Sequence, residues 1–184
     1  MRRQSTRIEK RIRNLEKTHR HLIDFIADLP EEMYHHQISP SKWSIAQAAN
    51  HVYLSEQLSL AYLKKKMSDL KSIPSYHPKS WVFLMALKLS IKSPIRFKAP
   101  LAINMWKDQP IRSQLDLDQN WSTLREELFA FIRTHAQEYG SHLVYRHPFT
   151  GRMTMSHMLI FLNDHMKHHF KQIHRIYRQL PQRP

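Results

Sequence analysis

Apolar side chains recur every three or four residues in four segments of the chain, which is the spacing of amphipathic helices. These segments cover residues 5–29, 44–67, 121–138 and 154–180. Four such helices predict an all-α fold, a four-helix bundle. The predicted inward positions are Ile8, Ile12, Leu15, His19, Leu22, Ile23 and Ile26, then Ala48, His51, Leu54, Leu58 and Tyr62, then Leu124, Leu128, Phe131 and Ile132, and finally Met158, Phe161, Leu162, His165, His169, Ile173 and Ile176.

Residues that start and stop helices flank these segments. Ser44 stands where an N-cap would begin the second helix. Pro30 and Pro181 would end the first and the fourth, since proline cannot continue a helix. Gly140 follows the third, where glycine commonly ends helices.

Residues 74–110, between the second and third helices, have a different composition. They hold five of the ten prolines, and residues 79–107 contain six basic side chains and no acidic one. The pattern predicts a short helix over residues 80–91 within irregular chain. Because bundles accommodate long crossover connections, we expect one domain over residues 1–184 with a proline-rich, basic crossover at 74–110.

The composition excludes several classes of protein. The absence of cysteine excludes a disulfide framework, a cysteine zinc site, an iron–sulfur cluster and a cysteine nucleophile. Two glycines are too few for a glycine-rich phosphate loop. No apolar run approaches the ~20 residues that cross a bilayer, and none near the N-terminus resembles a signal peptide. We therefore expect no transmembrane segment and a cytoplasmic location.

The chain is strongly basic, with 29 Lys and Arg against 15 Asp and Glu and a formal net charge of +14. This excess favours anionic partners in general, including nucleic acid, acidic lipid surfaces and anionic small molecules. Charge alone does not choose among them.

Three of the fourteen histidines occupy positions where apolar residues are expected. His165 and His169 are four apart, but chance alone gives about one such pair, so the spacing carries little weight. Their places on the inward stripe of the fourth helix, with His51 on that of the second, carry more. Buried polar groups without partners cost roughly 1–3 kcal/mol each, so the residues suggest either a three-histidine metal site or three hydrogen-bonded core histidines.

Several neighbours are candidates for supporting roles. Gln172 shares the face of His165 and His169, where its amide would orient a ligand histidine or pack at the edge of the core. His168 points about 100° away and would be exposed or assist from behind the ligands. Glu56 lies about 140° around the helix from His51, which disfavours a direct ligand role. Asp164 would pair with His168 or with solvent.

The other histidines rank lower. His157 lies too far along the fourth helix to join the trio, and His19 would be a core residue or line a pocket. Five more fall in loops or at helix ends, where we expect solvated side chains: His35, His36, His77, His142 and His147.

Three segments resemble the DinB-like (DinB/YfiT-like) metalloenzyme superfamily. Residues 43–51, WSIAQAANH, followed by Ser55 and Glu56, resemble the opening of its second helix, W-S-hydrophobic-small-x-x-hydrophobic-x-H. Residues 147–154, HPFTGRMT, and 165–173, HMKHHFKQI, are similar to its H-P-x-x-G-x-hydrophobic-T and H-x-x-H-H-x-x-Q-I segments. Residues 97–100, FKAP, resemble a motif of one branch.

The resemblance implies a bundle with a long crossover after the second helix, often as a homodimer. It also implies a divalent ion, zinc or nickel, on His51, His165 and His169. Characterised relatives include transferases that use a low-molecular-weight thiol such as bacillithiol or mycothiol, and a mycothiol-dependent isomerase. No substrate-binding residue carries over, because these residues vary across the family.

Our leading hypothesis is a metal-dependent enzyme that transfers a thiol to a small anionic substrate, ahead of a hydrolase. Gln172 or His168 would assist, and an external thiol would supply the sulfur that the chain lacks. The alternative is a basic binding protein for nucleic acid or an anionic surface, with a structural metal. A third hypothesis is a folded member without activity.

Overall fold

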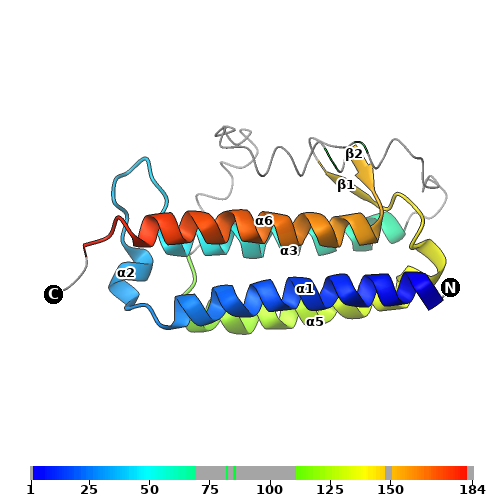
Figure 1. Cartoon of the computed structure of the whole chain (residues 1–184), viewed down its shortest axis with the longest axis horizontal. Coiled ribbons are helices and arrows are strands. Elements are labelled where there is room, and N and C mark those ends of the chain that lie inside the picture. Colours follow the sequence, from blue (N-terminus) through cyan, green and yellow to red (C-terminus); the bar gives the residue numbers. More distant parts are fainter. Residues whose placement is uncertain (1, 69–81, 83–84, 86–110, 148–150, 182–184) are drawn as a thin grey trace.

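Four long helices, α1 (Arg2–Ala27), α3 (Ile45–Met67), α5 (Gln114–Tyr139) and α6 (Met155–Tyr177), dominate this computed structural model (Figure 1). The structure describes residues 2–68, 82, 85, 111–147 and 151–181. Within them, α2 (Glu31–His35) is a short helix between α1 and α3. Strands β1 (Tyr145–His147) and β2 (Gly151–Met153) pair antiparallel just before α6.

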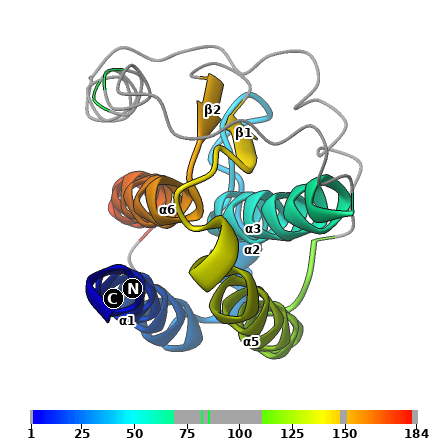
Figure 2. The ribbon, with the colours of Figure 1, turned by 90° about the vertical axis from the view of Figure 1, so that its right-hand side faces the viewer.

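The long helices stand at the corners of a square when seen end on (Figure 2). Each packs against two neighbours, so that α1 and α3 each contact both α5 and α6. This arrangement confirms the predicted all-α four-helix bundle, in which residues 69–113 join α3 to α5. None of the helices in the described part of the chain combines the length and apolarity needed to cross a membrane.

Side-chain caps fix where three of the helices begin. At α3, Ser44 Oγ accepts a hydrogen bond from the Gln47 backbone N–H, and Gln47 Oε1 accepts one from the Ser44 N–H, which is a capping box. Ser113 and Thr154 cap α5 and α6 in the same position. The predicted N-cap at Ser44 is therefore confirmed.

Helix α5 begins seven residues before the start predicted at residue 121. Ser113 supplies its cap, and Leu117 and Trp121 are fully buried and continue the inward stripe toward the N-terminus. The predicted stripe left Leu117 out, because polar residues surround it in the sequence. Gly140 follows the last residue of α5, as predicted.

The predicted inward position of Leu58 is wrong, because this side chain is 52% exposed. The buried face of α3 continues instead through Glu56, Ser59, Leu60 and Leu63. Leu58 falls outside that face, because the pitch of the helix carries the inward stripe through Glu56 and Ser59.

The chain that returns to α5 is anchored to both α3 and α1. The Arg112 guanidinium donates to Asn50 Oδ1 at 3.0 Å and lies over the Tyr53 ring. Gln114 Nε2 donates to the backbone carbonyls of Ile26 and Leu29, and so ties the start of α5 to the end of α1 and the turn after it. Of the helix predicted over residues 80–91, the structure describes only residues 82 and 85, both helical, and the 97–100 motif lies outside the described residues.

The β1–β2 hairpin was not predicted from the sequence. Its register pairs Tyr145 with Met153 and His147 with Gly151. Gly151 has a φ of +79°, a backbone conformation that residues with a Cβ adopt only at a cost in free energy. Along β1 the side chains alternate, so Tyr145 and His147 are buried while Arg146 is exposed.

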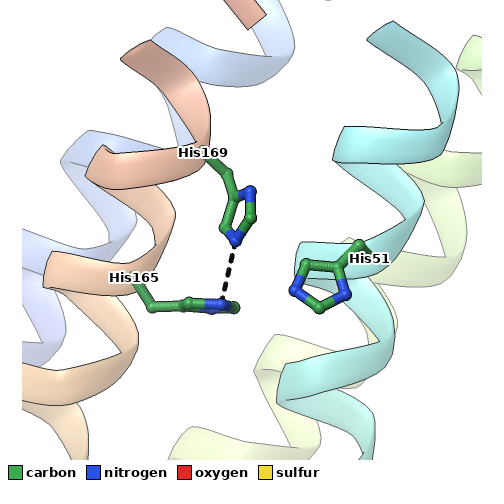
Figure 3. Close-up of side chains that lie close together, drawn as sticks. All are labelled: His51, His165 and His169. Atoms are coloured by element: carbon green, nitrogen blue, oxygen red, sulfur yellow. Dashed lines mark hydrogen bonds between the residues drawn. The ribbon is translucent and has the colours of Figure 1, made fainter. Parts of the chain in front are cut away.

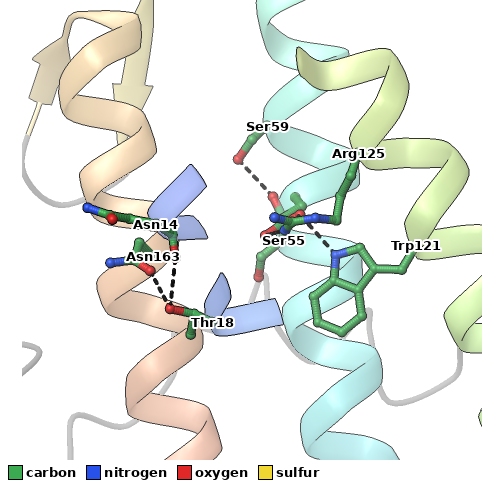
Figure 4. Close-up of polar contacts among 8 residues, drawn as sticks. Asn14, Thr18, Ser55, Ser59, Trp121, Arg125 and Asn163 are labelled. Carbon is green, nitrogen blue, oxygen red and sulfur yellow. Dashed lines mark hydrogen bonds and ion pairs between the residues drawn. The ribbon is translucent and has the colours of Figure 1, made fainter. Parts of the chain in front are cut away.

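An ion pair is buried where α3 packs on α5. Arg125 Nη1 lies 3.1 Å from both carboxylate oxygens of Glu56, and Trp121 Nε1 donates to Glu56 Oε2 at 2.9 Å. Glu56 is 1% exposed and Arg125 4%. Figure 4 shows Trp121 and Arg125 reaching from α5 toward α3.

On the other side of the bundle, Thr18 Oγ1 donates to Asn163 Oδ1 and ties α1 to α6.

Candidate metal centre

Three histidine side chains meet between α3 and α6 (Figure 3). His51 lies in the second turn of α3, a position fixed by the capping box at Ser44. His165 and His169 lie one turn apart on α6. Residues four apart share one face of a helix, so both α6 rings project toward α3. The structure therefore brings together the three residues that the sequence singled out.

The rings are close enough to share one ion. His165 Nε2 and His169 Nε2 are 3.1 Å apart. The centroid of the His51 ring lies 5.3 Å from that of His165 and 4.7 Å from that of His169. One nitrogen from each ring lies within 4.8 Å of the others.

Gln172 fixes the orientation of one of these rings. Its Oε1 lies 2.9 Å from His169 Nδ1. A carbonyl oxygen only accepts, so His169 Nδ1 carries the proton and its Nε2 presents a lone pair toward His165. This bond is the supporting contact that the sequence suggested for Gln172, on the nitrogen that would face away from a bound ion.

The trio is uncharged at neutral pH. Burial, together with the nearby His169 and His51, holds the pKa of His165 well below its usual range. Burial and the neighbouring His51 do the same for the pKa of His169, and burial lowers the pKa of His51 to about 4. Because metals bind neutral imidazole, none of the three rings has to lose a charging proton first.

Aromatic side chains enclose the histidines. The Trp43 ring lies 5.1 Å from that of His51 and is stacked on that of His169 at 6.2 Å. The Phe161 ring is stacked on that of His165 at 5.5 Å. These apolar neighbours favour uncharged rings, although His51 and His165 are only half-buried.

The donor set fits a divalent metal ion. Zinc holds histidine nitrogens at about 2.0–2.1 Å, which places tetrahedral ligand atoms about 3.3 Å from one another. The His165–His169 separation of 3.1 Å is close to that value, and a nitrogen of His51 lies within 4.8 Å of both. In addition, His165 Nδ1 is buried and makes no hydrogen bond.

The neighbours of the trio take separate places. The half-buried His168 ring lies 5.2 Å from that of His169, outside the cluster, as predicted. Glu56 turns away from His51 to bind Arg125, which agrees with the prediction that it is not a ligand. His157 lies in the first turn of α6, and Asp164 is half-buried.

Two other histidines contribute to the interior. His19 belongs to the core, its ring 4.7 Å from Trp121 on the α1–α5 side of the bundle. His147 was predicted to be solvated, which is wrong: it is 8% exposed, with its ring 4.6 Å from Phe161. The alternation along β1 buries it, but a strand of three residues gives too short a pattern to recognise in the sequence.

The remaining histidine predictions have mixed outcomes. His35 and His36 are exposed, as predicted, whereas His142 is half-buried with its Nδ1 enclosed. His77 lies outside the described residues.

A comparison with protein families gives one finding that bears on this site. The model of the DinB superfamily matches residues 14–173, a range that contains the four long helices in large part and all three histidines. No curated protein and no solved structure matches the chain.

Proposed function

The chain belongs to the DinB superfamily, and on that premise we propose that it is a metal-dependent enzyme. His51, His165 and His169 would hold one divalent ion, zinc or nickel. The reaction we propose is the transfer of a low-molecular-weight thiol to a small, anionic electrophile, with hydrolysis as the second choice. A cytoplasmic location and a homodimer stay predictions.

The observation that carries this proposal is the convergence of three neutral imidazoles on one point. Their nitrogens lie within 4.8 Å of one another, and the described residues bring no carboxylate into the cluster. Three histidine ligands leave a divalent ion with an open position, the arrangement of catalytic zinc sites, where a water or a thiol loses its proton readily.

The protein's own groups would orient and shield that site. Gln172 Oε1 accepts a hydrogen bond from His169 Nδ1–H, so His169 Nε2 stays directed toward the other histidines. Trp43 and Phe161 cover two of the rings, which makes part of the surroundings of the centre apolar. His168, half-buried beside His169, would assist from behind the ligands.

Composition supports an external thiol and an anionic substrate. The chain has no cysteine, so a sulfur nucleophile has to come from a second substrate. The formal net charge of +14 would raise the local concentration of anionic molecules.

The test is metal content, measured by ICP-MS on tag-free protein washed with chelator and reloaded. We expect about one zinc or nickel per wild-type chain and a large loss in His51→Ala. His142→Ala is the matched control, because His142 is also half-buried but lies outside the trio. A wild-type protein that takes up no metal, or a His51→Ala variant with full content, would contradict the proposal.

A basic surface favours one competing function. Lys167, Lys171 and Arg175 are exposed and follow one another every four residues along one face of α6. Such a stripe would bind nucleic acid or an anionic surface, with the metal then structural. Saturable binding of an oligonucleotide at physiological salt would support this alternative, whereas binding that disappears at modest salt would show only electrostatic attraction.

A further inference from the structure

A groove of about 430 Å³ lies between α1 and α5, the two long helices that do not carry the histidine trio (Figure 2). Sites for small molecules commonly have volumes of about 300–1,000 Å³. We propose that this groove binds a linear diamine, with an ammonium group at each end and an uncharged middle that carries an oxygen atom. The site is separate from the proposed metal centre and does not depend on it.

The two helices that form the groove run antiparallel. Arg133 Nε, near the end of α5, lies 2.9 Å from Glu9 Oε1, near the start of α1. At the other end of the pair, Gln114 Nε2 donates to the backbone carbonyls of Ile26 and Leu29. Positions along α1 and α5 therefore match in reverse order.

This order places a pair of carboxylates at each end of the groove. Glu16 and Glu126 are each seven residues from the ion pair just described, and Asp24 and Asp118 are each fifteen residues from it. All four side chains line the groove, and none forms an ion pair with another described residue. The two levels are eight residues apart, so ammonium groups about 12 Å from each other would each meet two carboxylates.

The groove differs in charge from the rest of this basic chain. Three arginines line it, but Arg125 is paired with Glu56 and Arg133 with Glu9. Within the described residues, four carboxylates therefore face Arg20 as the one unpaired guanidinium of the groove. Arg20 lies midway between the two carboxylate levels, so a positive charge is favoured at the ends of a ligand and disfavoured in its middle.

Two buried polar side chains lie between the same two levels and indicate what the middle of the ligand carries. His19 is 9% exposed and Arg125 4%, and both line the groove. His19 Nε2 and Arg125 Nη2 have no hydrogen-bond partner among the described residues. Because a guanidinium nitrogen only donates, Arg125 Nη2 calls for an acceptor such as an ether, hydroxyl or carbonyl oxygen. Both nitrogens are enclosed, so the oxygen reaches them as exposed rim side chains such as Arg20 change rotamer.

The test is isothermal titration calorimetry of the full chain with three diamines. Diaminooctane carries its amines at the ends of an eight-carbon chain, its 3,6-dioxa analogue has two ether oxygens in the middle, and putrescine is too short to reach both ends. We expect one dioxa diamine to bind per chain, about tenfold more tightly than putrescine, because a second ammonium group meets its own carboxylates. Diaminooctane should bind about fivefold more weakly than the dioxa analogue, because it offers no acceptor.

Two double variants locate the binding. Glu16→Gln with Glu126→Gln removes the carboxylates of one end, so the dioxa diamine should lose its advantage over putrescine. Glu127→Gln with Glu138→Gln is the matched control, because it removes the same charge from exposed positions outside the groove and should keep that advantage.

Three results would overturn the proposal. Equal affinities of the wild type for the dioxa diamine and putrescine would show that no ligand spans the groove. An equal loss in the control variant would show general attraction to acidic side chains. Equal affinities for diaminooctane and its dioxa analogue would show that His19 and Arg125 do not contact the ligand.

Discussion

Two polar clusters lie inside this bundle on different sides of α3, and they differ in how far their members satisfy one another. Glu56, Arg125 and Trp121 make an ion-paired set, in which the carboxylate accepts three hydrogen bonds from a charged and a neutral side chain while Arg125 Nη2 stays buried without a partner. His51, His165 and His169 present like groups to one another, and a hydrogen bond joins the two α6 rings.

The difference separates a structural cluster from a binding one. In the buried ion pair the opposite charges of Glu56 and Arg125 compensate each other, so no further ion is needed there. Neutral imidazoles packed around a common point gain most from a cation, which accepts all their lone pairs at once. Burial and polarity alone do not distinguish the two clusters, whereas the charges of the groups that meet in them do.

The largest effect is expected from breaking the structural cluster. Glu56→Gln keeps the size of the side chain but leaves Arg125 charged in the core without a counter-ion. We expect the free energy of unfolding to fall by about 3–5 kcal/mol, because removing one partner of a buried pair leaves an uncompensated charge. Urea denaturation measures it.

An exposed ion pair provides the matched control for this prediction. Lys64 and Glu127 form an exposed ion pair between α3 and α5. Glu127→Gln should therefore cost well under 1 kcal/mol, the usual range for exposed pairs. Equal losses of unfolding free energy in the two variants would contradict the prediction, because the buried pair would then contribute no more to stability than the exposed pair. Metal content should be unchanged in both.

A smaller effect is expected from loosening the binding cluster. Gln172→Leu removes the acceptor that orients His169 while keeping its bulk. Loss of such a supporting bond typically weakens metal affinity about 10- to 100-fold. Competition with a chromophoric chelator would measure the change. Gln179→Leu, which loses only an exposed contact to Lys42, should leave the affinity as it is.

The sequence predicts the binding cluster better than the structural one, for a physical reason. His51, His165 and His169 interrupt otherwise apolar stripes, so each is visible as an anomaly within its own helix. Glu56 and Arg125 are 69 residues apart and stand among polar neighbours. The two side chains meet only when α3 packs against α5, so the sequence gives no sign that they form an ion pair.

Local sequence also misses elements whose signal is short or weak. The four helices are predicted because each repeats its apolar spacing over several turns. The first two turns of α5 were missed, since they hold one buried leucine, Leu117, before Trp121. β1 and β2 have three residues each, so the burial of His147 depends on how the hairpin docks rather than on a recognisable pattern.

The smallest effect concerns His19, which packs against Trp121 beside the structural cluster. Burial and the nearby Arg125 and Arg20 lower the pKa of His19 to about 3 from 6.5. Between these values the unfolded chain binds a proton that the folded one does not, so stability falls as the pH drops below about 6.5 and continues to fall toward pH 3. The His19 share of the loss should be about 1.4 kcal/mol between neutral pH and pH 5.5.

A substitution at His19 separates its part of the stability loss at low pH from that of the other buried histidines. His19→Phe keeps an aromatic ring against Trp121 but cannot take up a proton. Urea denaturation at pH 7 and pH 5.5 should show the variant losing about 1.4 kcal/mol less than the wild type. Identical losses would contradict this prediction, because they would mean that folding leaves the pKa of His19 near 6.5 despite its burial beside Trp121 and Arg125.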